Sequence, residues 1–191
     1  MHGPAQAGWL LVALCAATGS YCLLRMRSRV EAQRRTAGSE ALMGFGMALM
    51  ALPAAVLAPP RWAWLAYAAV FGAAALRALW AARSDRHHLH HLVGACAMVY
   101  MAVAMAATPA AHAGHGGGGG GAPLLTGFLL LYFAGYVLVS GARLLPVSTV
   151  AAADGGGGRG VAVMGWADRT ELAMVCRLSM GIAMIAMLLT L

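Results

Sequence analysis

The chain contains no lysine and little acid: all thirteen of its basic residues are arginine, and only six residues are Asp or Glu. Charged residues make up 10% of the 191 positions, whereas hydrophobic residues make up 61% and the mean hydropathy is +0.74. This scarcity of charge excludes an ordinary water-soluble surface and is typical of an integral membrane protein. The net charge of +7 suits contact with anionic lipid better than binding of nucleic acid.

Several catalytic and redox signatures are also missing. The four cysteines fall inside apolar segments and form no CxxC pair, so we interpret them as small packing residues and not as a disulfide framework. No HExxH or GxSxG occurs, and the glycine runs lack the Lys-Ser/Thr of a phosphate-binding loop. No catalytic residue is assigned, and the sequence favours a role other than that of an enzyme.

Apolar segments occupy most of the chain. A membrane-crossing helix needs roughly 20 mostly apolar residues, and six segments meet that need: about 8–24, 40–58, 62–82, 88–108, 123–143 and 170–190. Backbone groups in lipid must bond to one another, and no period-two alternation indicates a barrel. The sequence therefore predicts an all-α polytopic membrane helix bundle forming a single domain over 1–191. The glycine-rich stretches 109–122 and 146–165 are expected to be flexible loops.

Local signals mark some helix ends. Ser39 is expected to cap the second span, Pro53 to kink it, and Pro123 to occupy the first turn of the fifth. Arginine predicts the orientation, because cytoplasmic loops are enriched in basic residues. The loops assigned to the cytoplasm contain or adjoin most arginines, namely Arg25, Arg27, Arg29, Arg34, Arg35, Arg77, Arg83, Arg86, Arg143, Arg159 and Arg169. The outer connections carry Arg61 alone, so both termini are predicted to lie outside.

Methionine recurs at helical spacing in three of the predicted spans. The second and sixth share the motif M-G-x-x-M-x-x-M, and the fourth carries an imidazole-to-thioether row. Residues three and four apart share a helix face, and these three helices are predicted to run in the same direction. The members of the rows are Met43, Met47, Met50, Met180, Met184 and Met187, and in the fourth span His87, His91, Met98, Met101 and Met105.

These rows suggest a site for a soft metal ion. Thioether sulfur suits Cu(I), and imidazole accepts copper as well as zinc, iron or nickel. We therefore hypothesise that copper is bound by, or passes along, the three helices, with histidines at the cytoplasmic mouth. The candidate ligands are His87, His88, His91, Met43, Met47, Met98, Met101, Met105, Met180 and Met184.

Two other interpretations stay open. Methionine and glycine at helical spacing also suit close packing in lipid, so the rows can instead form surfaces for a membrane-protein partner or a second copy of the chain. Alternatively, His91 is an axial ligand of haem in an electron-transfer module; no other predicted span contains histidine, which excludes bis-histidine ligation between spans.

Two ionisable side chains lie inside the predicted spans. Glu40 and Arg177 each precede the first methionine of the repeated motif by three residues. A charge within the bilayer is costly unless it is paired, so we predict that Glu40 and Arg177 form a buried ion pair, with His91 as a possible third member.

Four runs carry a resemblance to a known family. They are SEALMGFGMALMALP, HHLHHLVGACAMVYMAVAM, LYFAGYVLVSGARL and ELAMVCRLSMGIAMIAMLLT. The chain resembles the multi-pass actinobacterial membrane proteins grouped as domain of unknown function 5134, from the first span to the C-terminus. This resemblance implies a location in the cell membrane of an actinobacterium, and it implies no activity or catalytic residue.

Overall fold

The computed structural model describes residues 3–28, 31–53, 56, 59–83, 88–107, 122–144 and 170–191, and these form six helices and no strand. The helices are α1 (Gly3–Arg25), α2 (Glu31–Met50), α3 (Arg61–Ala82), α4 (His88–Ala107), α5 (Pro123–Leu144) and α6 (Thr170–Leu188). The all-helical prediction is thus confirmed for this part of the chain.

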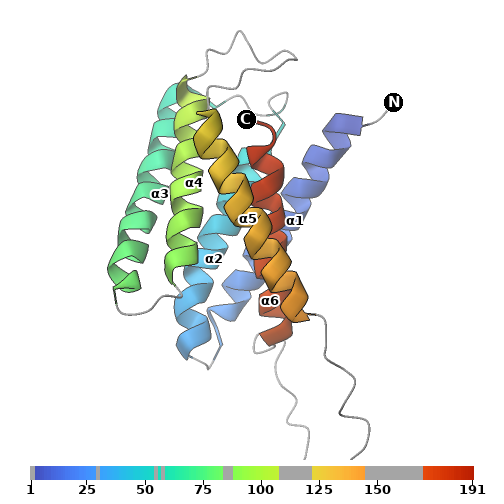
Figure 1. The fold of residues 1–191 in the computed structure, drawn as a ribbon, viewed down its shortest axis with the longest axis vertical. Helices are drawn as coiled ribbons and strands as arrows, with labels where there is room; N and C mark the ends of the chain where they lie inside the picture. The colour runs from blue at the N-terminus through green and yellow to red at the C-terminus, as the bar shows by residue number, and fades with distance from the viewer. Residues whose placement is uncertain are drawn as a thin grey trace, which may run out of the picture.

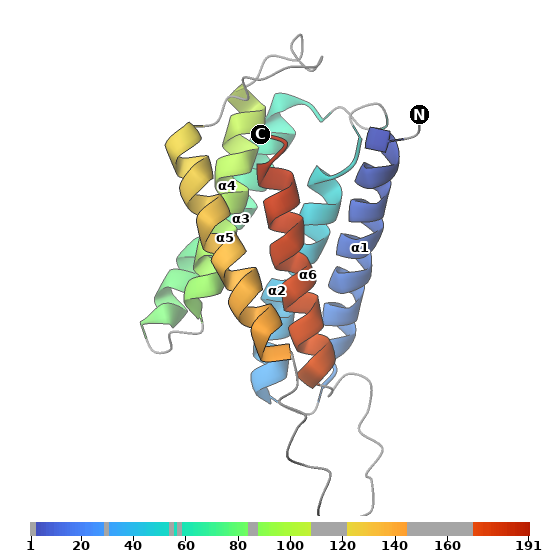
Figure 2. The same cartoon turned by 45° about the vertical axis from the view of Figure 1, so that its right-hand side comes forward.

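The helices alternate in direction along the length of the bundle (Figures 1 and 2). Consecutive helices pack in pairs, α1 with α2, α3 with α4 and α5 with α6. Further contacts join α6 to α1 and α2, and α2 to α4, so α2 holds a central place. Helices α2, α4 and α6 run in the same direction, and α1 begins at the end of the bundle where α6 finishes (Figure 2).

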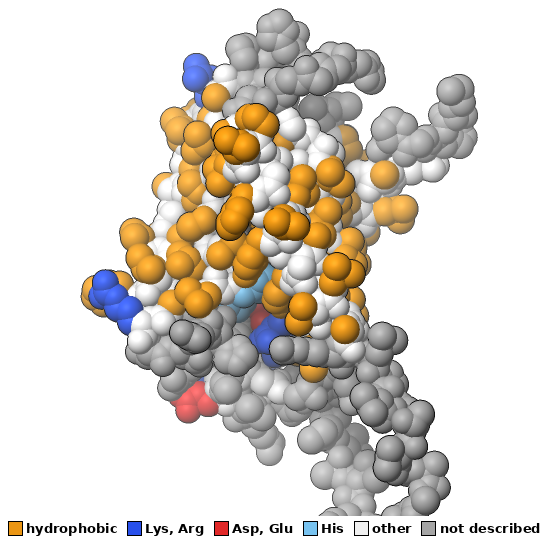
Figure 3. Space-filling model, viewed as in Figure 1, with side chains coloured by type: hydrophobic (Ala, Val, Ile, Leu, Met, Phe, Trp, Pro, Cys, Tyr) orange, Lys and Arg blue, Asp and Glu red, His pale blue; other side chains and the backbone are white. Residues whose placement is uncertain are grey.

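The outside of the bundle is apolar. Large side chains such as Leu124, Trp80 and Leu131 are mostly exposed, and hydrophobic side chains run along the helices in Figure 3. Four helices are long and apolar enough to cross a membrane, at Gln6–Arg25, Arg61–Ala82, Leu89–Ala107 and Pro123–Ala142. A water-facing surface of this kind would be costly, so these features indicate a membrane protein.

Helices α2 and α6 fall short of that criterion for different reasons. The first half of α2 carries Glu31, Arg34 and Glu40, which lower its hydropathy, and the apolar part of α6 is the shorter segment Leu172–Leu188. Their interior faces nevertheless supply much of the buried core.

Two local predictions about α2 were wrong. Ser39 lies inside the helix, which begins at Glu31, and its hydroxyl donates to the Thr36 carbonyl at 2.8 Å instead of capping a helix start. The helix ends at Met50, before Pro53, so the proline does not kink it. Pro123 does begin α5, because a first-turn residue needs no backbone N–H donor.

Glycine allows the central helices to approach closely. A Cβ atom on Gly44 of α2 would lie 2.9 Å from the backbone of Gly19 in α1. A Cβ atom on Gly94 of α4 would lie 2.7 Å from the terminal methyl of Met43. Gly44 in the repeated motif of α2 and Gly94 of α4 thus let backbone or methionine fill the space of a side chain.

Candidate functional site: a methionine core beside a buried ionic cluster

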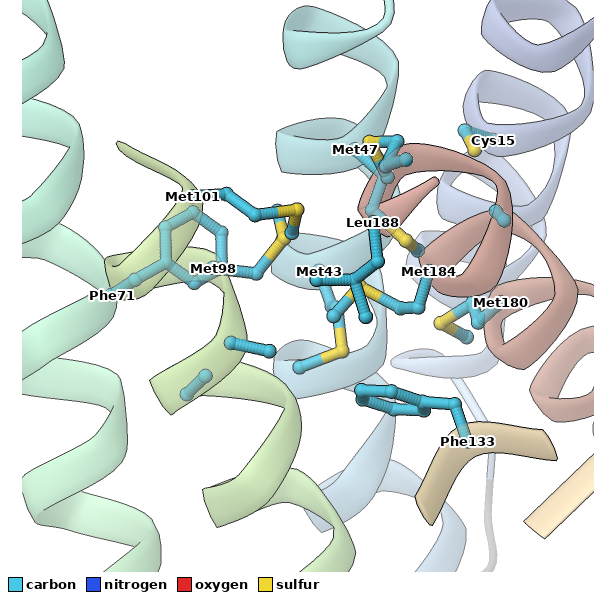
Figure 4. Close-up of a cluster of buried hydrophobic side chains, with 14 of the residues drawn as sticks. Cys15, Met43, Met47, Phe71, Met98, Met101, Phe133, Met180, Met184 and Leu188 are labelled. Carbon is cyan, nitrogen blue, oxygen red and sulfur yellow. The ribbon is translucent and has the colours of Figure 1, made fainter. Parts of the chain in front are cut away.

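The three methionine rows meet in one buried cluster. Its members from α2, α4 and α6 are Met43, Met47, Met98, Met101, Met180, Met184 and Met187, each at most 7% exposed. Figure 4 shows labelled methionines from all three helices reaching into the same region, with Phe133 of α5 and Phe71 of α3 at its borders. We call this set of seven side chains the methionine core.

The position of Met43 shows how the rows come together. Its thioether extends from α2 to Gly94 of α4, one turn before Met98. Because lipid is as apolar as methionine, burying these side chains gains little from the hydrophobic effect in a membrane, and close contact must stabilise the arrangement. The same closeness places uncharged, polarisable sulfur from three helices in one interior.

A cavity adjoins one end of the methionine core. Its volume is about 660 Å³, and its lining includes Met50, Met101, Met105 and Met187. These residues belong to the C-terminal halves of α2, α4 and α6, so the cavity lies at the end of the bundle where α1 begins. Met105, which was a candidate metal ligand from the sequence, is 39% exposed and borders this cavity.

The ionic cluster lies beyond the other end of the methionine core. Glu40 accepts from Arg25 Nη1 at Oε2 over 2.6 Å and from Arg177 Nε at Oε1 over 2.7 Å. The side chains of Glu40 and Arg25 are each 1% exposed, and that of Arg177 is 34% exposed. Three helices therefore converge on one carboxylate, which Glu40 supplies from the middle of α2.

Arg25 was not among the predicted site residues. Its position directly after the first span made it look like one of the arginines that mark the cytoplasmic side. The structure instead turns its side chain inward to Glu40, and its Nε has no hydrogen-bond partner among the described residues. Two cations on one carboxylate leave this cluster with a formal charge of +1.

The histidines are placed unevenly. His87 lies outside the described residues, and the structure describes the backbone of His88 but not its side chain. His91 is partly buried in the first turn of α4. His90 was not among the candidate ligands; its ring stacks on Tyr136 with centroids 3.7 Å apart.

Contacts from other helices hold His90. Its Nδ1 lies 3.2 Å from the Tyr132 hydroxyl, and Arg177 is near enough to interact with the ring electrostatically. In the lower part of the face drawn in Figure 3, histidine, acidic and basic side chains are visible beside one another. Tyr132 and Tyr136 are four residues apart and so share a face of α5. This spacing was the signal in the sequence that α5 could supply polar partners to a side chain of another helix.

Two cysteines also meet across helices. The Thr18 hydroxyl of α1 and the Ser179 hydroxyl of α6 are 3.3 Å apart, and about one helical turn away on each helix lie Cys22 and Cys176, whose thiols interact electrostatically. Cys22 Sγ also donates to Glu40 Oε2 at 3.7 Å. Among the described residues, no three side chains of His, Cys, Asp and Glu are grouped as they would be around a metal ion. Any metal held in this interior would therefore depend on thioethers or on fewer than three such ligands.

Comparison with known sequences defines the class of protein. The family described as a domain of unknown function (DUF5134) matches residues 32–191. The chain therefore belongs to that family. The matched residues extend from the second residue of α2 through α6, and α1 lies outside the match. No curated protein and no solved structure matches the chain.

Proposed function

We propose that this protein binds Cu(I), or passes it across the cell membrane, by means of the methionine core. The observation that carries the proposal is the meeting of buried methionines from α2, α4 and α6. Thioether sulfur is a soft ligand that suits Cu(I), and several such ligands from separate helices can surround one ion. In this proposal all six helices cross the bilayer, and the bilayer is the cell membrane of an actinobacterium.

The charge of the site suits passage better than storage. Thioethers are neutral, so an ion in the methionine core keeps its full positive charge in a medium of low dielectric constant, which is unfavourable. This cost limits the affinity and lets the ion exchange between neighbouring sulfur atoms. The cavity lined by Met50, Met101, Met105 and Met187 is the natural mouth at one end of the row.

The opposite mouth is the end of α4 that carries the histidines. With both termini outside, as the arginine distribution favours, this end faces the cytoplasm. His87, His88 and His91 are the proposed residues for loading or releasing the ion there, since imidazole is also a copper ligand.

The test is a Cu(I) competition titration against a coloured chelator, under reducing conditions, of purified protein in which all four cysteines are replaced by alanine, so that any sulfur ligand must be a thioether. We expect Met98→Leu with Met101→Leu to weaken binding at least tenfold, because both sulfur atoms are lost. Folding should survive, since each such exchange costs less than about 1.5 kcal/mol.

The matched control is Met26→Leu with Met174→Leu. These methionines are 43% and 40% exposed and lie outside the methionine core, so the double variant should bind as the parent does. Unchanged affinity in the Met98/Met101 variant, or equal weakening in both double variants, would contradict the proposal.

A further inference from the structure

A pair of thiols adjoins the ionic cluster where α1 packs against α6. Cys22 of α1 is fully buried and Cys176 of α6 is partly buried; Glu40 contacts both Cys22 and Arg177, the residue next to Cys176, so one carboxylate joins the two positions. A polar contact about one helical turn from the cysteines also joins α1 to α6, because the Thr18 and Ser179 hydroxyls are 3.3 Å apart. The thiols are thus held together by helix packing and not by a flexible loop.

The pair also continues a row of sulfur ligands. Cys176, Met180 and Met184 follow one another at intervals of four, so they lie along one face of α6. Met180 and Met184 belong to the methionine core. An ion leaving the methionine core along α6 therefore meets the Cys176 thiol about one helical turn beyond Met180.

We propose that Cys22 and Cys176 form a two-coordinate Cu(I) site at the inner end of the methionine core. This inference rests on the proposed copper function for the choice of ion. Thiolate is a soft ligand that selects Cu(I), and this ion accepts two sulfur ligands in line. Neither cysteine was a candidate ligand from the sequence, because all four cysteines lie in apolar segments without a CxxC pair and were interpreted as packing residues.

Charge favours the site at this level of the bundle. Binding replaces two thiol protons by one Cu(I), so that two neutral thiols become a bis-thiolate complex with a charge of −1, and two protons leave for solvent. The cluster of Arg25, Glu40 and Arg177 carries a charge of +1 and touches Cys22 through Glu40. The two charges then cancel, whereas an ion on neutral thioethers gains no such compensation.

The experiment uses the full chain in detergent, with Cu(I) alone as the probe and oxygen excluded. One variant, Cys15→Ala with Cys96→Ala, keeps the thiol pair; the other, Cys22→Ala with Cys176→Ala, removes it. Two signals report thiolate ligation and not thioether ligation: ultraviolet charge-transfer absorption, and release of two protons per bound ion in weakly buffered solution.

We expect both signals in the variant that keeps the pair and neither in the variant that lacks it. The single variant Cys176→Ala provides a second test, because the partly buried position of this residue makes misfolding less of a concern. It should also lose both signals while its helical circular dichroism stays unchanged. The proposed site would be contradicted if a variant that lacks the thiol pair kept either signal. It would also be contradicted if Cys15→Ala with Cys96→Ala, which keeps the pair, showed neither signal.

The outcome separates this site from the methionine core. If Cys22→Ala with Cys176→Ala still binds Cu(I) without releasing protons, the methionine core holds an ion by itself. If that variant binds none and the pair-retaining variant binds one ion with proton release, the thiol site stands and the proposed role of the methionine core fails.

Discussion

Replacement of Glu40 by Gln tests the ionic cluster most severely. The side chain keeps its shape but loses the charge that faces Arg25 at 2.6 Å and Arg177 at 2.7 Å. Arg25 is 1% exposed and cannot reach water without opening the α1–α2 pair, whereas Arg177 is 34% exposed and can turn outward. We therefore expect Glu40→Gln to lower the free energy of unfolding by about 3–5 kcal/mol, the usual cost of removing one partner of a buried pair. Most of this loss is assigned to Arg25, which is left buried without its carboxylate.

Arg177→Gln provides the matched comparison. This substitution leaves the Arg25–Glu40 pair intact and removes a partly exposed contact, so the free energy of unfolding should fall by about 1 kcal/mol or less. Replacing Arg25 and Glu40 together by Met should restore much of the stability, because apolar residues of similar size often substitute for a buried pair without loss. The free energy of unfolding in mixed micelles, followed by circular dichroism, measures all three. Equal losses in Glu40→Gln and Arg177→Gln would refute this assignment.

Three further predictions concern packing and proximity. Gly44→Ala should lower the free energy of unfolding by about 1–3 kcal/mol, because the new Cβ atom would meet the backbone of α1. Gly94→Ala should lower it less, because the new Cβ atom would meet the flexible end of Met43, which can move. Thermal unfolding in detergent compares the two variants. Tyr132→Phe should cost about 1 kcal/mol in the same assay through its lost hydrogen bond, and no change would refute that bond. In protein lacking the other two cysteines, mild oxidation should join Cys22 to Cys176 with the loss of two hydrogens, measured by intact mass; a mass unchanged by oxidation would contradict their contact.

The sequence was most informative where a pattern repeats along a helix. The spacing of methionine at three or four residues in three segments predicted three helix faces, and counting the spans between the segments predicted a shared direction, which the structure shows. The matching places of Glu40 and Arg177 before their motifs suggested that they face each other, and the structure places them in contact. The first inference depends on helical periodicity and the number of spans, and the second depends also on the cost of an unpaired charge in the bilayer.

Relations set by helix rotation could not be predicted in the same way. Arg25 lies at the end of α1, where a basic residue ordinarily marks the membrane boundary, so its inward side chain carries no separate signal. The thiol pair depends on how α1 turns against α6, and no spacing within either helix contains that information. His90 contacts Tyr132 and Tyr136, and this contact likewise depends on how α5 is rotated against α4, which the sequence does not show.

The proposal that methionine from three helices holds the ion is tested most directly by X-ray absorption at the copper edge. The sample is a variant with all four cysteines replaced by alanine and loaded with Cu(I), in which any sulfur ligand from the protein must be a thioether. We predict a first shell of sulfur only, lost when Met43, Met98 and Met184 are replaced by Leu. A shell of nitrogen or oxygen, or no bound copper, would contradict the proposal.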